Sequence, residues 1–244
     1  MKKILWILAV FTLLFSCSDD DSKPAADEIP ANEKFLRKIT YPDPSISYTF
    51  DYNADKTVRK ITSSLTDDPF AQVFSFTYEN GVIISVDRLR ANNTIRTTFS
   101  YDANRKLTGV TTGNNYRPMT YYPADNSYVT TSPQGRPMKF YLTADGDVGR
   151  TVEQTQTGEF PIGLIFNPQK FGALYNSNAI TLYLYLIEPI AIVVFGPQHS
   201  KRPVENISYV GNIPYVNTYD SQGFITEAKE DPSSAGITFE YMRL

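Results

Sequence analysis

A short pattern recurs along most of the sequence: an alternating stretch ends in an aromatic residue, a polar turn follows, and a second alternating stretch returns. The copies lie at residues 47–58, 73–83, 97–107, 138–148 and 215–225, and residues 237–241 resemble a single closing strand. The aromatic residues Tyr52, Tyr78 and Tyr101, which end successive stretches, are 26 and 23 residues apart. Repeats of this length predict stacked units of supersecondary structure.

The alternation predicts antiparallel β-structure. Successive side chains of a strand point to opposite faces, so Phe74, Phe76 and Tyr78 share one face and the intervening Ser and Thr residues share the other. Because the turns between copies are only a few residues long, neighbouring strands must be antiparallel. We therefore expect an all-β fold: an antiparallel meander of hairpins that forms a curved sheet or a partly closed barrel. A length of 244 residues suits one such domain, which we place at residues 34–244.

The first 16 residues are typical of a secretory signal. Two lysines precede an apolar run over residues 4–15, which is too short to cross about 30 Å of hydrocarbon as a helix. Residues 14–16, Leu-Phe-Ser, stand directly before Cys17 and resemble the bacterial lipobox. That resemblance implies cleavage before Cys17 and lipidation of its sulfur and new amino group, which together hold a protein stably on a membrane. The alternative is a free thiol, and the chain has no second cysteine to pair with it.

The next stretch, residues 17–33, predicts a flexible tether. It is acidic, contains proline and has few large apolar groups, so it cannot bury enough surface to fold. Acidic residues directly after the lipidated cysteine resemble the export signal that sends Bacteroidetes lipoproteins to the outer face of the outer membrane. The alternative is a linker that only adds solubility. We expect a lipid-anchored protein of the outer membrane that faces the cell exterior.

Two motifs in the repeats carry a family resemblance. Residues 219–225, Tyr-Asp-Ser-Gln-Gly-Phe-Ile, resemble a YD repeat of the kind that builds the β shells of RHS proteins and teneurins, and Tyr101-Asp102 with Leu107 is a looser copy. This chain is too short to enclose cargo as those proteins do. Together with the lipobox, the pattern resembles a family of Bacteroidetes lipoproteins of unknown function with a porin-like β fold. That resemblance implies a curved sheet and carries no activity or site residues.

Residues 159–200 break the repeat. They contain the apolar runs 160–166 and 180–195. Glu188-Pro189 interrupts the second run, which argues against a membrane span. Alternating leucine and tyrosine over residues 182–186 predicts a strand buried on both sides, and a short helix is compatible with residues 168–178. We expect this segment to pack on the apolar face of the sheet and fill the core. The alternative is that it lines a ligand cavity.

The sequence offers little catalytic chemistry. His199 is the only histidine and lies in a turn-rich loop, where we expect it to be solvated, so zinc sites and Cys/His nucleophiles are not predicted. Glu188 is the carboxylate in the most apolar context and is a candidate for a glycoside hydrolase with paired carboxylates; the alternative is an exposed bend. Asp145 and Asp147 fall in a predicted hairpin turn, where Asp is common. We predict no catalytic residues, no metal and no cofactor, with Cys17 as the one modified residue.

The aromatic rows recur on the same face of successive strands, as a core requires, and we favour a core over a platform for ligands. A net charge of −3 gives no basic excess for nucleic acid. We therefore expect a non-enzymatic binding or scaffold module at the cell surface, with a glycan, a peptide or an outer-membrane protein as partner. One alternative is a surface glycoside hydrolase, and a second is an accessory subunit of an outer-membrane complex.

Overall fold

The computed structural model describes residues 28–43, 46–65, 72–90, 92–132, 135–187, 199–209 and 211–244. The signal sequence, Cys17 and Glu188 lie outside these residues, so the predictions made for them concern parts of the chain that the structure does not describe. Residues 28–33, the end of the predicted tether, are the first described residues and include a 3-10 helix, η1 (Ala31–Glu33). They contact the turn near Gln222, whose side-chain amide donates a hydrogen bond to Ile29 O at 3.0 Å.

The described residues form an all-β fold, as the alternation predicts, with two antiparallel sheets and one short α-helix, α1 (Thr181–Ile187). The strands of the first sheet are β1 (Lys34–Thr40), β2 (Ser47–Tyr52), β3 (Val58–Ser63), β4 (Gln72–Glu79), β5 (Val82–Arg90), β6 (Asn93–Tyr101), β7 (Leu107–Thr112), β8 (Asn115–Pro118), β16 (Val216–Tyr219), β17 (Ile225–Lys229) and β18 (Ile237–Arg243). Those of the second sheet are β9 (Thr120–Tyr122), β10 (Ser127–Thr131), β11 (Pro137–Leu142), β12 (Val148–Thr155), β13 (Gly158–Phe166), β14 (Val204–Ser208) and β15 (Asn212–Pro214).

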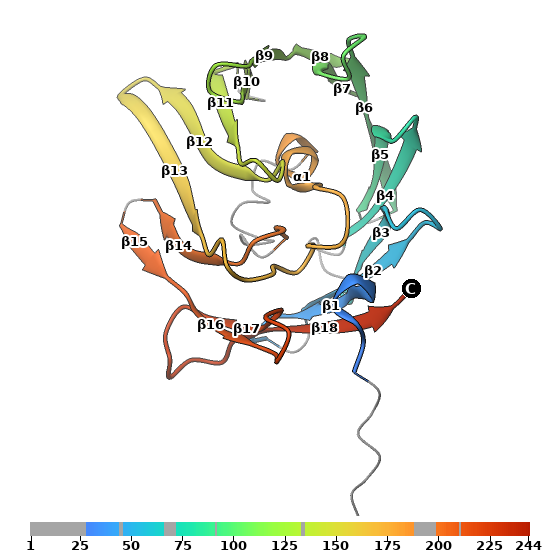
Figure 1. The fold of residues 1–244 in the computed structure, drawn as a ribbon. Helices are drawn as coiled ribbons and strands as arrows, with labels where there is room; N and C mark the ends of the chain where they lie inside the picture. The colour runs from blue at the N-terminus through green and yellow to red at the C-terminus, as the bar shows by residue number, and fades with distance from the viewer. Residues whose placement is uncertain are drawn as a thin grey trace, which may run out of the picture.

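The two sheets together curve into a ring around α1 (Figure 1). Within the described residues, the first sheet has 11 strands in the order β16-β17-β18-β1-β2-β3-β4-β5-β6-β7-β8, and the second has 7 in the order β15-β14-β13-β12-β11-β10-β9. β18 is the closing strand that the sequence predicts, and it pairs with β1 and with β17. The first and last strands of the ring domain are therefore neighbours.

Two stretches of chain belong to both sheets and join them into the ring. Residues 115–122 pair with β7 through β8 and then with β10 through β9, and Met119 N–H donates to Thr108 O at 2.9 Å where the partner changes. Residues 212–219 do the same between β14 and β17, and Tyr215 N–H donates to Glu205 O at 2.8 Å. The ring therefore closes through two corners at which one strand serves two sheets.

The predicted hairpin unit has one local structure that explains its composition. In the turn that starts at Asp102, the carboxylate Oδ1 accepts hydrogen bonds from Asn104 N–H and Lys106 N–H, each at 2.8 Å. The turn that starts at Asp220 repeats this geometry, and its fourth residue is Gly223 with φ +87°. Asp therefore closes the turn from within, and glycine removes the steric cost of a left-handed backbone.

The tyrosines that end the strands fix neighbouring strands to one another. Tyr52 Oη donates to Leu36 O at 2.8 Å, and Tyr78 Oη donates to Val58 O at 2.7 Å. Tyr101 and Tyr241 make the same kind of bond, to Ile83 O and Ile225 O. Burial raises the pKa of all four tyrosines above their usual range, so they stay protonated as donors.

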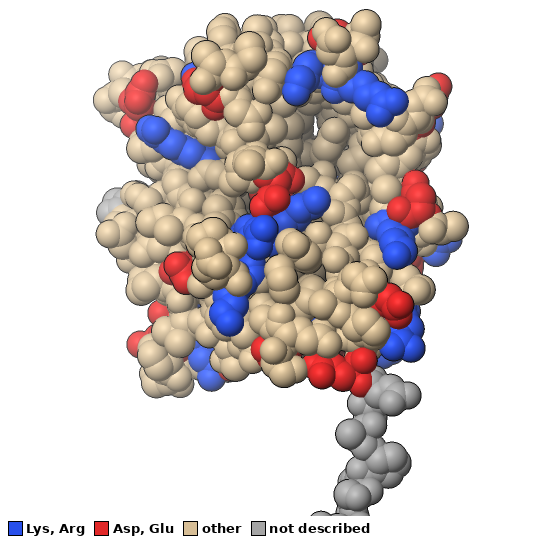
Figure 2. All heavy atoms as spheres, viewed as in Figure 1, with Lys and Arg blue, Asp and Glu red and all other residues tan. Residues whose placement is uncertain are grey.

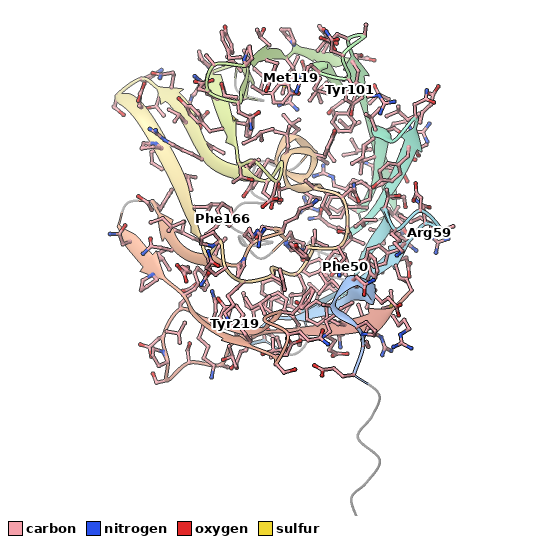
Figure 3. All side chains as sticks on the ribbon, viewed as in Figure 1. Phe50, Arg59, Tyr101, Met119, Phe166 and Tyr219 are labelled. Carbon is pink, nitrogen blue, oxygen red and sulfur yellow. The ribbon has the colours of Figure 1, made fainter. Side chains whose placement is uncertain are left out.

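The prediction that the aromatic rows form the core is confirmed. Tyr48, Phe50, Phe74, Phe76 and Phe99 are each at most 6% exposed. Figure 3 shows Phe50, Tyr101 and Met119 inside the ring and Arg59 outside it. The inner faces of the strands and the apolar side chains of α1 form one continuous cluster.

Of the segment that breaks the repeat, residues 159–166 belong to β13 in the wall of the ring, where they were not expected, and residues 171–187, which we call the inner segment, lie inside the ring as expected (Figure 1). The secondary structure of the inner segment was predicted wrongly. Residues 181–187 form α1 rather than a strand, and residues 168–178 form turns rather than a helix. The apolar character of α1 on all sides fits a position surrounded by the core, and alternation cannot separate a buried helix from a buried strand. A helix also satisfies its own backbone hydrogen bonds at the centre of a ring, where no strand lies alongside.

Buried polar groups hold α1 at both ends. At its start, Asp147 Oδ1 accepts from Thr181 Oγ1 at 3.3 Å, and Oδ2 accepts from Lys201 N–H at 2.7 Å. At its end, the Arg117 guanidinium donates to Leu186 O at 2.6 Å. An acidic group near the first turn of a helix and a cation near its last carbonyl groups both interact favourably with the helix dipole.

His199 is buried, so the prediction of a solvated histidine is wrong. Its side chain is 2% exposed, and its ring centroid lies 5.7 Å from that of Phe50. His199 is held inward because the residues that follow it pair with the inner segment: Leu174 N–H donates to Ser200 O at 3.1 Å, and Gly172 N–H donates to Lys201 O at 2.9 Å.

Candidate functional site

A pocket opens at the corner where residues 115–122 leave β7 for β10. The Met119 N–H still donates to Thr108 O next to β7, and from Thr120 onward the strand pairs with β10. Pro118 lacks an amide hydrogen and stands at the point of divergence. β7 and β9 therefore diverge, and a gap opens between their backbones.

This corner pocket has a volume of about 520 Å³. Such a volume lies within the range of roughly 300–1,000 Å³ that small-ligand sites occupy. Its lining comes from the turn before β7, from the start of β7 and from the divergent strand. The lining residues are Asp102, Asn104, Lys106, Leu107, Thr108, Met119, Thr120, Tyr121 and Pro123. Figure 2 shows the surface hollowed on the viewed end, below the arc of β7 to β10.

The floor of the corner pocket is apolar and belongs to the core. Leu107 is 2% exposed and Met119 is 5% exposed. Tyr128 replaces the backbone partner that β7 has lost, since Leu107 N–H donates to Tyr128 Oη at 3.3 Å. Tyr121 packs against Tyr128 with ring centroids 5.0 Å apart, and its hydroxyl donates to Asn126 Oδ1 at 2.9 Å. The aromatic wall of the pocket is thus fixed in place.

The rim carries polar groups whose hydrogen-bonding capacity the fold uses only in part. Asp102 closes its turn with Oδ1 alone, and within the described residues Oδ2 takes no hydrogen bond. The Asn104 side chain is exposed and likewise makes no hydrogen bond to a described residue. Lys106 Nζ lies 4.1 Å from the centroid of the Tyr121 ring, so the cation is held across the mouth of the pocket. A carboxylate, an amide and an ammonium group therefore surround an apolar floor.

Sequence reasoning found only part of this site. It singled out Asp102 and Leu107 as a copy of the turn motif, and the structure brings both to the pocket. It missed Lys106, Met119 and Tyr121, because the pocket depends on where one strand changes partners. The pair of prolines, at 118 and 123, around a tyrosine-rich stretch was the available signal.

The carboxylates singled out for chemistry lie elsewhere. Asp145 is exposed and pairs with Arg202, whose Nε lies 3.1 Å from Oδ2. Asp147, two residues on, is 1% exposed, and burial raises its pKa to about 6. One of its oxygens accepts a hydrogen bond from Thr181 at the start of α1 and the other accepts one from Lys201 N–H, so its role in the structure is to fix α1.

The described part of the chain has neither a cluster of metal ligands nor a helix that could span a membrane. No three His, Cys, Asp or Glu side chains of those residues gather closely enough to hold a metal ion. Across the same residues, no helix has the length and apolar character needed to cross a membrane.

Comparison with known proteins shows the fold. The chain is similar to a porin-like protein from Bacteroides uniformis, with 11% sequence identity and a TM-score of 0.50, in a match that covers 86% of this chain and 98% of that chain. The fold is porin-like. A porin-like protein from Bacteroides vulgatus matches with 12% identity and a TM-score of 0.41, over 86% of this chain and 100% of the other. No protein-family model matches the chain, and no curated protein matches it.

The porin-like fold that the sequence resemblance implied is therefore confirmed at the level of fold. At these identities the likeness carries no activity, and the lipid anchor predicted at Cys17 stays a prediction.

Proposed function

We propose that this protein is a lipid-anchored binding module of the outer membrane that faces the cell exterior and takes a saccharide in the corner pocket. The observation that carries the proposal is the combination of a pocket of about 520 Å³, an apolar floor and three polar side chains on its rim, whose Asp102 Oδ2, Asn104 amide and Lys106 ammonium groups make no hydrogen bond to a described residue. Saccharides offer apolar ring faces and hydroxyl edges, which such a site complements.

The unused polar groups favour binding over a structural role for the corner. The hydrogen bonds of the turn need Asp102 Oδ1, whereas Oδ2 and the polar ends of Asn104 and Lys106 line the pocket without a hydrogen bond to a described residue. A hydroxyl can donate to the carboxylate and accept from the ammonium or amide group. The pocket is therefore built to hold a molecule rich in hydroxyl groups.

The binding test uses the full chain, purified in detergent, on an array of bacterial and host glycans. We expect a subset of saccharides to bind, and Asn104→Ala to weaken that binding. Asn114→Ala is the matched control, since Asn114 is an exposed asparagine in the neighbouring turn and does not line the pocket. Equal binding by both variants, or no saccharide bound at all, contradicts the proposal.

The anchor and its location have separate tests. Mass spectrometry of the native protein should find acyl groups on Cys17, and Cys17→Ala should move the protein from the membrane fraction to the soluble fraction. Protease added to intact cells should degrade it, because the proposal places the domain outside. Protection from protease would place it in the periplasm instead.

Two outcomes would replace a binding module with one of the alternatives. Release of reducing sugar by the purified protein, abolished by Glu188→Gln, would support the glycoside hydrolase. Capture of a neighbouring outer-membrane protein by mild crosslinking, with no saccharide bound, would support the accessory subunit.

A further inference from the structure

A second feature lies on the outer face of the second sheet, away from the corner pocket. Cross-strand pairing sets Tyr122 opposite Ser127, Ser127 opposite Tyr141, and Tyr141 opposite Arg150. Strands lie about 4.8 Å apart, so this row places the two tyrosines roughly 10 Å from each other. We call Tyr122, Lys139, Tyr141 and Arg150 the outer band.

The two cations of the outer band are held in place by the rings. Lys139 Nζ lies 4.6 Å from the centroid of Tyr141 and 5.7 Å from that of Tyr122, and the Arg150 guanidinium carbon lies 5.4 Å from the centroid of Tyr141. Asp125 fixes Lys139 further through an ion pair of 2.6 Å. Cations positioned in advance lose little conformational entropy when they bind a ligand.

Arg150 keeps its hydrogen-bonding capacity. It is exposed, and no described acidic side chain lies within ion-pair distance of it. The next residue in its row is Gly163, which has no side chain to cover the guanidinium. A free guanidinium presents parallel N–H groups that match the two oxygens of a carboxylate.

A shallow depression of about 210 Å³ adjoins the outer band and gives it an apolar floor. Val129 and Val152 line it, and Val152 is 6% exposed although it lies on the outer face. Glu159 lies at the far side, where it accepts a hydrogen bond from Gln154 at 3.0 Å. Glu159 pairs with Gln154, which is four residues along β12 from Arg150, so that acid stands about 13 Å from the row of Arg150. It does not repel an anion at Arg150.

We propose that the outer band binds an acidic oligosaccharide, with a sugar carboxylate on Arg150, the cation of the band that no described acid pairs with. The spacing of the band suits a chain of linked sugars, because its two cations flank one ring and the apolar floor runs beside them. This site is distinct from the corner pocket and does not depend on it.

The test measures binding of a short oligogalacturonate to the full chain in detergent by isothermal titration calorimetry. A neutral galactose oligomer of the same length and inorganic phosphate serve as comparison ligands. We expect the acidic oligomer to bind more tightly than either, and added salt to weaken its binding. Arg150→Gln should weaken it by about tenfold or more, the loss expected for one charge-assisted pair.

The matched control is Arg37→Gln, since Arg37 is also exposed, on β1 of the other sheet. It should leave affinity unchanged, and Tyr141→Phe should retain binding because the ring remains. Equal affinity for the acidic and neutral oligomers, a preference for phosphate, or an unaffected Arg150→Gln variant would overturn the proposal. If the acidic oligomer fails while another saccharide still binds in an Asn104-dependent way, only the outer band is refuted and the corner pocket stands.

Discussion

Replacing Asp147 should change how stability depends on pH. Its carboxylate is 1% exposed and is surrounded by the inner segment, with Thr181 Oγ1 and Lys201 N–H as its hydrogen-bond donors. Burial disfavours the charged form and raises the pKa to about 6 from the ordinary 3.8, against the smaller opposing effect of those hydrogen bonds. The folded protein therefore holds the Asp147 proton more tightly than the unfolded chain does.

The sign and size follow from that difference of about two pKa units. The raised pKa of Asp147 contributes about 3 kcal/mol to the free energy of unfolding. This contribution is fully present below about pH 4 and is lost as the pH rises through about 6. Asp147→Asn removes the titration, and its amide still offers an acceptor to Lys201 N–H and a donor to Thr181. The free energy of unfolding of the variant, relative to wild type, should therefore rise by about 3 kcal/mol between pH 4 and pH 7.

Urea denaturation, followed by far-UV circular dichroism at intervals across this range, measures the effect. The control is Asp145→Asn, which removes an exposed carboxylate from the same turn and should leave the wild-type pH dependence in place. If the difference between Asp147→Asn and wild type stays constant with pH, or changes in the opposite direction, then the carboxylate is not buried in the way described.

Other substitutions test the packing of the ring, each by its denaturation midpoint. Tyr78→Phe removes the donor to Val58 O and should cost about 1–2 kcal/mol, whereas Tyr116→Phe, on an exposed ring, should change stability by less than about 0.5 kcal/mol. Gly172→Ala should cost about 1–3 kcal/mol, because a Cβ there would lie 2.5 Å from the backbone oxygen of residue 200. Gly223→Ala, at φ +87°, should cost about 1–2 kcal/mol. A Gly172 variant as stable as wild type would show that the inner segment is loosely packed.

The sequence predicted the parts of the fold that depend on local chemistry. Alternation at Phe74 and Phe76 identifies a strand because only a two-residue period puts both rings in the core. The turn at Asp220 and Gly223 is predictable because the carboxylate and the glycine each satisfy a local need. These features need no knowledge of distant residues.

The parts that it missed depend on long-range contacts. The apolar run of α1 fits a buried helix and a buried strand equally, and the choice is made by the ring around it. Asp147 occupies a turn much like that of Asp102, and only the approach of residues 181 and 201 buries it. The corner pocket likewise exists because one strand changes partners at Met119.

The position of β18 has a consequence for biogenesis. β18 lies between β17 and β1, so the edge of β1 that faces β18 stays unpaired until β18 has been synthesised. Until then both neighbours are open sheet edges, which invite pairing with other chains. Completion of the domain therefore requires that β18 has left the ribosome or the translocation channel.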